Sequence, residues 1–238
     1  SPRDCIRLLS LVESAKKPTI AFCMGEFGTL SRLLCGRYGA PFTYATFSKD
    51  REIAPGQLSF DEMQTLYRYD KITRETPVFG VLGDPIGHSL SPLLHNTAMQ
   101  AIGYDGVYLP LRVPANELSA TLDDFNWVGM RGYSVTIPHK EAALAKATLS
   151  EEIVRQIGAA NTLVKRPEGW WADNTDYAAA LESLETAFRA GESLDGKKVL
   201  ILGAGGAARA IALGFVRRGG GLVIASRTTE RAKKLSVE

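Results

Sequence analysis

A glycine-rich stretch late in the sequence has the residue types and spacing that suit a dinucleotide. Gly203-Ala204-Gly205-Gly206-Ala207-Ala208 reads G-x-G-x-x-A, follows an aliphatic run at 199–202 and precedes a run with helical periodicity. The first glycine permits a tight turn, and the second lets the backbone approach a pyrophosphate at the helix N-terminus. We therefore predict cofactor contacts at Gly203, Ala204, Gly205, Gly206 and Ala207, the alternative being an ordinary glycine-rich turn.

The residues after the next predicted strand favour NADP over NAD. An NAD site usually has an acidic residue here, which binds the ribose 2′-hydroxyl. This chain has Ser226-Arg227-Thr228 instead. A guanidinium pairs with a phosphate, two hydroxyls can hydrogen-bond it, and no carboxylate stands there to repel it. We predict that Ser226, Arg227 and Thr228 bind the 2′-phosphate of NADP; the alternative is that Arg227 is a solvent-facing residue at a helix start.

Four further motifs precede the glycine-rich stretch and carry hydroxyl, amide and charged groups. They are GHSLSP at 87–92, SVTIPHK at 134–140, GAANT at 158–162 and NTD at 174–176. Together with the glycine-rich stretch, and in this order, they resemble the shikimate dehydrogenase family from about residue 76 to the end. The resemblance implies an NADP-dependent oxidoreductase of aromatic amino acid biosynthesis, which interconverts 3-dehydroshikimate and shikimate.

The same resemblance implies that Lys140 and Asp176 are the catalytic pair. Hydride transfer at a secondary alcohol requires a proton to be taken from, or given to, the oxygen. Lys140 follows Pro138 near a predicted helix start, where it can exchange that proton, and Asp176 can orient it and hold the substrate hydroxyl. Without the surrounding motifs, a structural salt bridge is the alternative.

The substrate contacts that the resemblance implies include hydroxyl and amide side chains. They are Ser89, Ser91, Thr136, Lys140, Asn161 and Asp176. Ser89 and Ser91 correspond to the family's carboxylate-binding serines, and Thr136 and Asn161 to its ring-hydroxyl contacts. Ser91 before Pro92 also fits a helix N-cap, and a helix N-terminus suits a carboxylate, so the two roles are compatible. Asn161 taken alone is more typical of a turn.

Residues 1 to about 75 resemble a different family, the type I 3-dehydroquinate dehydratases. The resemblance rests on Met24-Gly25 through Ser31-Arg32 and on Ala54-Pro55-Gly56-Gln57. The family fold is a (β/α)8 barrel, of which this block corresponds to the last two βα units. The resemblance implies that Arg32 and Gln57 bind substrate, whereas Ile53 stands where the family usually has serine. The Schiff-base lysine and its partner histidine lie on earlier strands of the family, so lyase activity is expected only in a complete parent protein.

The order of dehydratase and then dehydrogenase resembles the bifunctional enzymes of plants and some other organisms, and this chain is expected to be an internal segment of one. We expect the barrel remnant at 1–75, a shikimate-binding catalytic domain at 76–190 and the N-terminal part of a Rossmann NADP domain at 191–238. Only two of the roughly six strands of a dinucleotide-binding sheet are present, which suggests truncation at the C-terminus.

Short β-rich runs alternate with longer amphipathic runs, which is typical of α/β proteins with parallel sheets. In the first block we predict helices at 3–15, 29–37 and 59–70 and strands at 19–24 and 41–46, with a capping box between Ser59 and Glu62. In the second block we predict strands at 78–83, 106–111 and 132–137, a hairpin at 161–165 and 169–172, and helices from 91, at 116–125, at 139–147 and at 176–190. In the third we predict strands at 199–202 and 221–225 around a helix at 207–218.

Composition excludes several other classes of protein. The 238 residues carry a formal charge of +2, and the basic residues at 227–234 fit a solvated helix face, so no nucleic-acid partner is expected. No apolar run approaches the roughly 20 residues of a membrane helix. The three cysteines and three histidines fit no zinc spacing, so we expect no metal and a reducing compartment: the cytoplasm, or a plastid in a plant.

Three alternatives to a shikimate dehydrogenase stay open at this point. Quinate is the second candidate substrate, which makes a quinate/shikimate dehydrogenase the nearest alternative. A non-catalytic relative would bind a ring acid or nucleotide without turning it over, although the presence of Lys140 and Asp176 argues against it. A methylene-tetrahydrofolate-type dehydrogenase shares the two-domain layout, but the paired serines and the Asn174-Thr175-Asp176 motif count against it.

Overall fold

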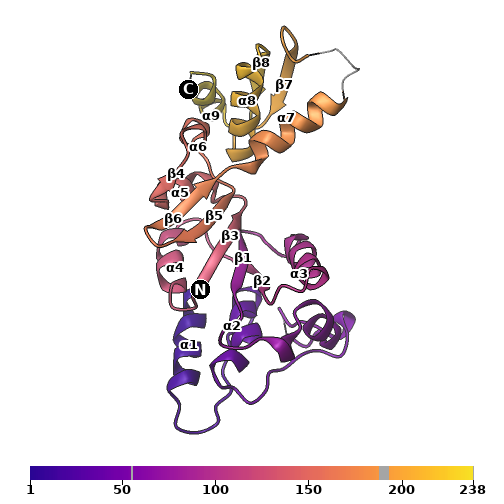
Figure 1. The fold of residues 1–238 in the computed structure, drawn as a ribbon, viewed down its shortest axis with the longest axis vertical. Helices are drawn as coiled ribbons and strands as arrows, with labels where there is room; N and C mark the ends of the chain where they lie inside the picture. Colours follow the sequence, from indigo (N-terminus) through magenta and orange to yellow (C-terminus); the bar gives the residue numbers. More distant parts are fainter. Residues whose placement is uncertain (55, 188–192, 238) are drawn as a thin grey trace. The chain divides into compact units, whose positions relative to one another are not determined.

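The computed structural model describes residues 1–54, 56–187 and 193–237. The chain forms two compact units, Ser1–His139 and Lys140–Glu238 (Figure 1). The predicted boundary between a catalytic and a nucleotide-binding domain at 190/191 lies outside the described residues, and the three-domain division stays a prediction.

The first unit contains a parallel sheet that matches the predicted strands. Its strands are β1 (Val78–Gly83), β2 (Val107–Arg112) and β3 (Met130–Val135), in the order β2-β1-β3. Val81 and Leu82 of β1 are buried, as are Leu109 and Leu111 of β2, which is why these runs are almost continuously apolar. The helices that connect the strands are α3 (Ser91–Ala101) and α4 (Leu118–Phe125).

Asn96 fastens α3 to β2. Its side chain is 2% exposed. Its Nδ2 donates to the carbonyl oxygens of Pro92 and Tyr108, each at 2.8 Å, and its Oδ1 accepts the Tyr108 N–H at 2.9 Å. Every polar atom of this buried amide therefore has a partner.

We expect Asn96→Leu to destabilise the protein by about 3 kcal/mol, because each buried polar group left without a partner costs roughly 1–3 kcal/mol. Denaturant unfolding of the two proteins measures the difference. Asn116→Leu, at an exposed loop position, is the control and should change stability by no more than about 0.5 kcal/mol. Equal midpoints for the Asn96 variant and the parent would contradict the role of the buried amide.

The N-terminal segment of this unit is mainly helical. It contains α1 (Arg3–Ser14), α2 (Thr29–Leu34), and the short turns η1 (Glu26–Gly28), η2 (Gly36–Tyr38), η3 (Lys49–Arg51), η4 (Glu62–Leu66) and η5 (Tyr69–Lys71). The predicted helices near 3–15 and 29–37 are present, the second shortened to α2 followed by η2. The capping box is present too, since the Ser59 N–H donates to Glu62 Oε2 at 2.7 Å and the Glu62 N–H to Ser59 Oγ at 3.1 Å.

Three predictions for this segment are wrong. The runs at 19–24 and 41–46 are not strands, and the second contributes only an isolated bridge between Thr46 and Ser59. A β-strand needs hydrogen-bonded neighbours, and the described residues offer these runs no ladder partner. The helix predicted at 59–70 is broken into η4 and η5, because Arg68 takes a left-handed conformation with φ of 50°.

The same N-terminal segment shares its core with the sheet region of the first unit. α1 contacts α2 and α4, and α2 contacts β2. The Tyr38 and Trp127 rings stack with their centroids 4.5 Å apart, and Arg3 pairs with Asp124. Residues 1–75 and 76–139 therefore fold as one body.

The second unit contains a hairpin region and two strands of a parallel sheet. Its elements are α5 (Lys140–Lys146), β4 (Leu149–Ser150), α6 (Glu152–Ile157), β5 (Thr162–Arg166), β6 (Gly169–Asp173), α7 (Thr175–Ala187), β7 (Lys198–Leu202), α8 (Gly206–Arg217), β8 (Gly221–Ala225) and α9 (Thr229–Val237). β5 and β6 pair antiparallel, as predicted, and β4 runs parallel to β6. The last residues of the helix predicted at 176–190 lie outside the described residues.

β7 and β8 pair in parallel, and α8 covers one face of this two-stranded sheet (Figure 1). Ile201 packs against Ala208 and Ala212 of this helix. Side chains on the opposite face are exposed, with Leu200 at 59%, Leu202 at 80% and Val223 at 58%. This alternation follows from the twofold repeat of a strand, and it leaves one apolar face of the two-stranded sheet uncovered within the described residues.

Candidate active site

Lys140 and Asp176 form an ion pair in the second unit. Lys140 is the first residue of α5 and Asp176 the second of α7. Lys140 Nζ lies 2.5 Å from Asp176 Oδ2, and the two side chains are 16% and 28% exposed. The pair is thus largely enclosed, yet open enough for a ligand to reach both groups.

Asn161 fixes the other oxygen of the Asp176 carboxylate. Its Nδ2 donates to Asp176 Oδ1 at 3.0 Å and to Thr175 Oγ1 at 2.8 Å. Its Oδ1 accepts the Thr175 N–H at 3.1 Å and the Thr162 hydroxyl at 2.9 Å. The structure therefore brings together three of the predicted substrate contacts, namely Lys140, Asn161 and Asp176.

Asn174, for which no role was predicted, hydrogen-bonds the backbone that carries this cluster. It is 6% exposed. Its Nδ2 donates to the Ala159 carbonyl at 2.7 Å, and its Oδ1 accepts the Asp176 N–H at 3.1 Å. The Asn174-Thr175-Asp176 motif contained the signal, because an amide two residues before the carboxylate can bond the backbone that carries it.

Ser89, Ser91 and Thr136 lie in the first unit, beyond the carboxyl ends of β1 and β3, where sites of parallel sheets gather. All three are half-buried. Thr136 reaches the end of β1, because its N–H donates to the Leu82 carbonyl at 2.9 Å and its methyl group occupies the space left free by Gly83.

The predicted N-cap role of Ser91 is wrong. Ser91 is the first residue of α3, Leu90 is the N-cap residue, and no side chain caps the helix there. Instead, Ser89 Oγ accepts the Ser91 N–H at 3.3 Å. The helix therefore begins one residue earlier than a cap at Ser91 would place it, within the usual uncertainty of a helix end.

Arg112, at the end of β2, anchors the loop that carries the two serines. Its Nε lies 2.8 Å from Asp84 Oδ1, at the start of that loop, and its Nη1 lies 2.9 Å from Glu26 Oε2. Glu26 belongs to the N-terminal segment. No local pattern links these three residues, so sequence reasoning missed the network.

The glycine-rich stretch has the geometry of a phosphate-binding turn. Gly203 has a φ of 125°, which favours glycine, and its N–H donates to the Ala225 carbonyl at 2.7 Å. Nothing lies within 4 Å of the place where a side chain of Gly203 or Gly205 would begin. α8 starts at Gly206, and the first N–H groups of a helix have no partner within the helix, which suits a pyrophosphate.

Ser226, Arg227 and Thr228 form the turn between β8 and α9. The Thr228 N–H donates to Ser226 Oγ at 3.2 Å. Arg227 and Thr228 are exposed, and Arg227 has no acidic partner in the described part of the chain. The guanidinium is therefore available to an anion such as a ribose phosphate.

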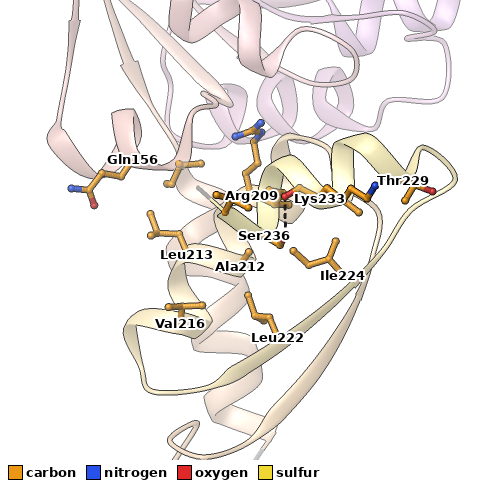
Figure 2. Close-up of a pocket in the computed structure, with 14 residues that line it drawn as sticks. Gln156, Arg209, Ala212, Leu213, Val216, Leu222, Ile224, Thr229, Lys233 and Ser236 are labelled. Atoms are coloured by element: carbon orange, nitrogen blue, oxygen red, sulfur yellow. Dashed lines mark hydrogen bonds between the residues drawn. The ribbon is translucent and has the colours of Figure 1, made fainter.

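A pocket of about 590 Å³ lies between α6, α8, β8 and α9 (Figure 2). Its apolar wall includes Leu213 and Leu222, and Arg209 and Lys233 supply its cationic groups. Neither the turn at 203–207 nor the residues at 226–228 line it. The pocket is thus separate from the predicted cofactor contacts.

His139 precedes Lys140 and is 1% exposed. Its Nε2 lies 2.6 Å from the Val113 carbonyl, so this nitrogen carries the proton and donates it. Burial lowers the pKa of His139, against smaller opposing effects of the Val113 carbonyl and Asp84. Burial also lowers the pKa of His95.

These lowered pKa values predict loss of stability on acidification. The unfolded chain takes up the proton first as the pH falls through about 6.5, so the stabilisation is present above this pH and lost below it. Thermal unfolding measured from about pH 7.5 to about pH 5.5 should show a falling midpoint. His139→Gln retains a donor for Val113 and should make the fall smaller, with the remainder due to His95. An unchanged fall would show that His139 is not a source of this acid sensitivity.

Arg32 and Gln57, the predicted dehydratase contacts, have separate environments in the first unit. Arg32 is 2% exposed; its Nη1 donates to the Tyr44 carbonyl at 3.2 Å, and its guanidinium lies 4.3 Å from the Phe22 ring centroid. Gln57 Oε1 instead accepts the Ile53 N–H at 3.0 Å within its own loop. Pro55 of this motif lies outside the described residues.

Two family models match the chain. Residues 81–163 match the shikimate dehydrogenase substrate binding domain, and residues 1–74 match type I 3-dehydroquinase. The part of the chain that the structure describes contains no helix long and apolar enough to cross a membrane.

Curated relatives show the same two segments. The chain is 35% identical over 245 aligned residues to the chloroplastic bifunctional 3-dehydroquinate dehydratase/shikimate dehydrogenase of Arabidopsis thaliana, covering 98% of this chain and 40% of that protein. It is 41% identical to the shikimate dehydrogenase (NADP(+)) of Syntrophobacter fumaroxidans, covering 68% of this chain and 54% of that protein. The chain therefore spans about half, or less, of these relatives' length.

Solved structures agree on the fold. Shikimate dehydrogenase from Aquifex aeolicus matches with a TM-score of 0.64 and 33% identity, over 70% of this chain and 61% of that one. The Thermus thermophilus enzyme in complex with NADP(H) and shikimate matches with a TM-score of 0.58 and 36% identity, over 68% and 60%. The chain has a shikimate dehydrogenase-like α/β fold preceded by a dehydroquinase segment, as predicted.

Proposed function

We propose that this chain is an internal part of a bifunctional 3-dehydroquinate dehydratase/shikimate dehydrogenase, and that residues from about 76 onward carry its dehydrogenase function. The reaction is the NADP-dependent, reversible reduction of 3-dehydroshikimate to shikimate in aromatic amino acid biosynthesis. The observation that carries the proposal is the cluster of Lys140, Asp176 and Asn161 in the same unit as a dinucleotide-type turn. The named activities of the matched relatives support it.

Lys140 is the group that exchanges a proton with the reacting oxygen. When the ketone is reduced, the Lys140 ammonium donates to the developing alkoxide, and in the reverse direction the amine accepts the hydroxyl proton. Asp176, 2.5 Å from Nζ, orients the ammonium, and Asn161 holds the carboxylate in place. Bound NADP(H) supplies or accepts the hydride.

The remaining substrate contacts recognise the ring acid. Ser89 and Ser91 bind the carboxylate through their hydroxyl groups, and Thr136 binds a ring hydroxyl. Arg112 helps to hold this loop through Asp84. Loss of any one of these hydrogen bonds is expected to weaken substrate binding more than the proton transfer itself.

NADP is the cofactor that the turn residues favour. The turn at Gly203–Ala207 receives the pyrophosphate, and Ser226, Arg227 and Thr228 receive the 2′-phosphate. The support is the open space at Gly203 and Gly205 and the exposed guanidinium of Arg227.

Absorbance of reduced nicotinamide tests the assignment directly. The complete protein that contains this chain is mixed with shikimate and NADP, and the assay is repeated with NAD and with quinate. A rise with shikimate and NADP, but little with NAD or quinate, is the expected result. A rise of equal size with quinate would make the protein a quinate/shikimate dehydrogenase, and no rise with either acid would leave the non-catalytic alternative.

Dehydratase activity belongs to the complete protein in this proposal. Arg32 and Gln57 bond separate backbone groups, of Tyr44 and Ile53, and the described residues form no barrel. The 238 residues alone should not dehydrate 3-dehydroquinate, whereas the complete protein should. The compartment that we propose is the cytoplasm, or the plastid in a plant, which agrees with the free thiols of Cys5, Cys23 and Cys35.

A further inference from the structure

Gly206 lies against the side chain of Lys140. A methyl group on Gly206 would come within 2.8 Å of Lys140 Cβ, 2.9 Å of Lys140 Cδ and 3.3 Å of Ala159 Cβ. Gly205, one residue earlier, has nothing within 4 Å of the same point. Gly206 is not among the glycines with positive φ. Its close contact with Lys140, and not its backbone conformation, is therefore the reason why glycine is needed at this position.

Lys140 has little room to move away from Gly206. Its carbonyl accepts the Ala160 N–H at 2.8 Å, which fixes the backbone and hence the position of Cβ. Its Nζ is held at 2.5 Å by Asp176, and the side chain is only 16% exposed. Rotation of the far end of the side chain cannot relieve a clash at Cβ.

The other neighbour of Gly206 belongs to the same cluster. Ala159 is fully buried, and its carbonyl accepts the Asn174 amide that also holds the Asp176 backbone. Ala159 also packs on Ala210 of α8. The start of α8 therefore touches both the lysine and the framework of the carboxylate.

We infer that Gly206 is a positioning residue for Lys140: the start of the nucleotide-binding helix is the surface against which the lysine side chain is held beside Asp176. This inference deepens the proposed function, on whose assignment of Lys140 as the proton-exchanging group it rests. In the G-x-G-x-x-A pattern, Gly206 occupies a variable position, and the pyrophosphate alone does not require glycine there.

Kinetics of Gly206→Ala in the complete protein test the inference. A displacement of about 1 Å at a reacting group can cost about a hundredfold, so kcat should fall about ten- to hundredfold, with KM for NADP within about twofold. Gly205→Ala is the matched control with the opposite signature, because its added methyl group enters the space meant for the pyrophosphate. It should raise KM for NADP, a change that Gly206→Ala should not produce.

Chemical labelling provides a readout that needs no catalysis. Acylation of Lys140 by acetic anhydride, followed by peptide mass spectrometry, reports how well the amine is held by Asp176. Gly206→Ala should be acylated several-fold faster at Lys140 than the parent, and Gly205→Ala at the parental rate. Parental labelling and parental kcat for Gly206→Ala would overturn the inference. Absence of shikimate oxidation by the parent would remove the proposed function and leave the labelling comparison to decide the contact.

A double substitution covers the case in which Gly206→Ala does not fold. Removing the lysine side chain by Lys140→Gly should relieve the clash, so Lys140→Gly with Gly206→Ala should unfold at nearly the same temperature as Lys140→Gly alone. If Gly206→Ala destabilises both backgrounds equally, the glycine is required for a reason other than Lys140, and the inference fails.

Discussion

Replacing Lys140 with alanine should lower kcat for shikimate oxidation by about a hundred- to ten-thousandfold, the range over which a positioned proton-transfer group accelerates a reaction. Shikimate affinity should change only a few-fold, because the other proposed contacts remain. Steady-state kinetics with the complete protein, together with calorimetric titration of shikimate, separates the two effects. The substitution is expected to remove stabilisation of the transition state, in which the proton moves, and not of bound shikimate.

Two controls separate proton exchange from charge and from folding. Lys140→Arg keeps a positive charge, but a guanidinium does not release its proton near neutral pH, so kcat should stay low. Lys146→Ala, at the other end of the same helix, should retain parental kcat. Normal turnover by Lys140→Ala would remove Lys140 from the mechanism.

Replacing Arg227 with alanine should raise KM for NADP about ten- to hundredfold and leave KM for NAD nearly unchanged. A hydrogen bond to a charged group contributes about 1.5–3 kcal/mol, and each 1.4 kcal/mol is a factor of ten. Only NADP carries the 2′-phosphate that we propose the guanidinium binds, so the change in the ratio of the two KM values isolates this contact.

Arg231→Ala is the matched control, since Arg231 is an equally exposed arginine on the following helix α9. It should leave the NADP-to-NAD preference unchanged. If Arg227→Ala weakened the binding of NADP and of NAD equally, Arg227 would act by stabilising the turn. The 2′-phosphate would then have to be recognised by other residues.

The parallel sheet and the hairpin could be predicted because their signals are local. Val78–Gly83 is almost entirely buried, so it is apolar throughout, and the turn between β5 and β6 separates two complementary runs. Lys140 and Asp176 could be selected from their motifs, although 36 positions separate them. The short β4 and α6 were missed, because two and six residues are too few to establish a period.

The parts that could not be predicted depend on distant partners. The apolar run at 19–24 satisfies every local rule for a strand, yet whether it pairs is decided by strands elsewhere. Arg112 illustrates the same limit at the site, since its partners Asp84 and Glu26 are 28 and 86 positions away. Gly206 belongs to the glycine-rich stretch and Lys140 to the SVTIPHK motif. Each motif had a predicted role of its own, so nothing in the sequence indicated that the two residues are in contact.

The common core of residues 1–139 ties the stability of the sheet region to that of the N-terminal segment. A chain divided near residue 75 would separate α1 from α4 and α2 from β2, and it would lose the Arg3–Asp124 pair. Each of the two pieces would then expose apolar surface that the intact unit buries, and such surface favours aggregation. A substitution in α1 is therefore expected to destabilise the sheet region at 78–135 as well as the N-terminal segment.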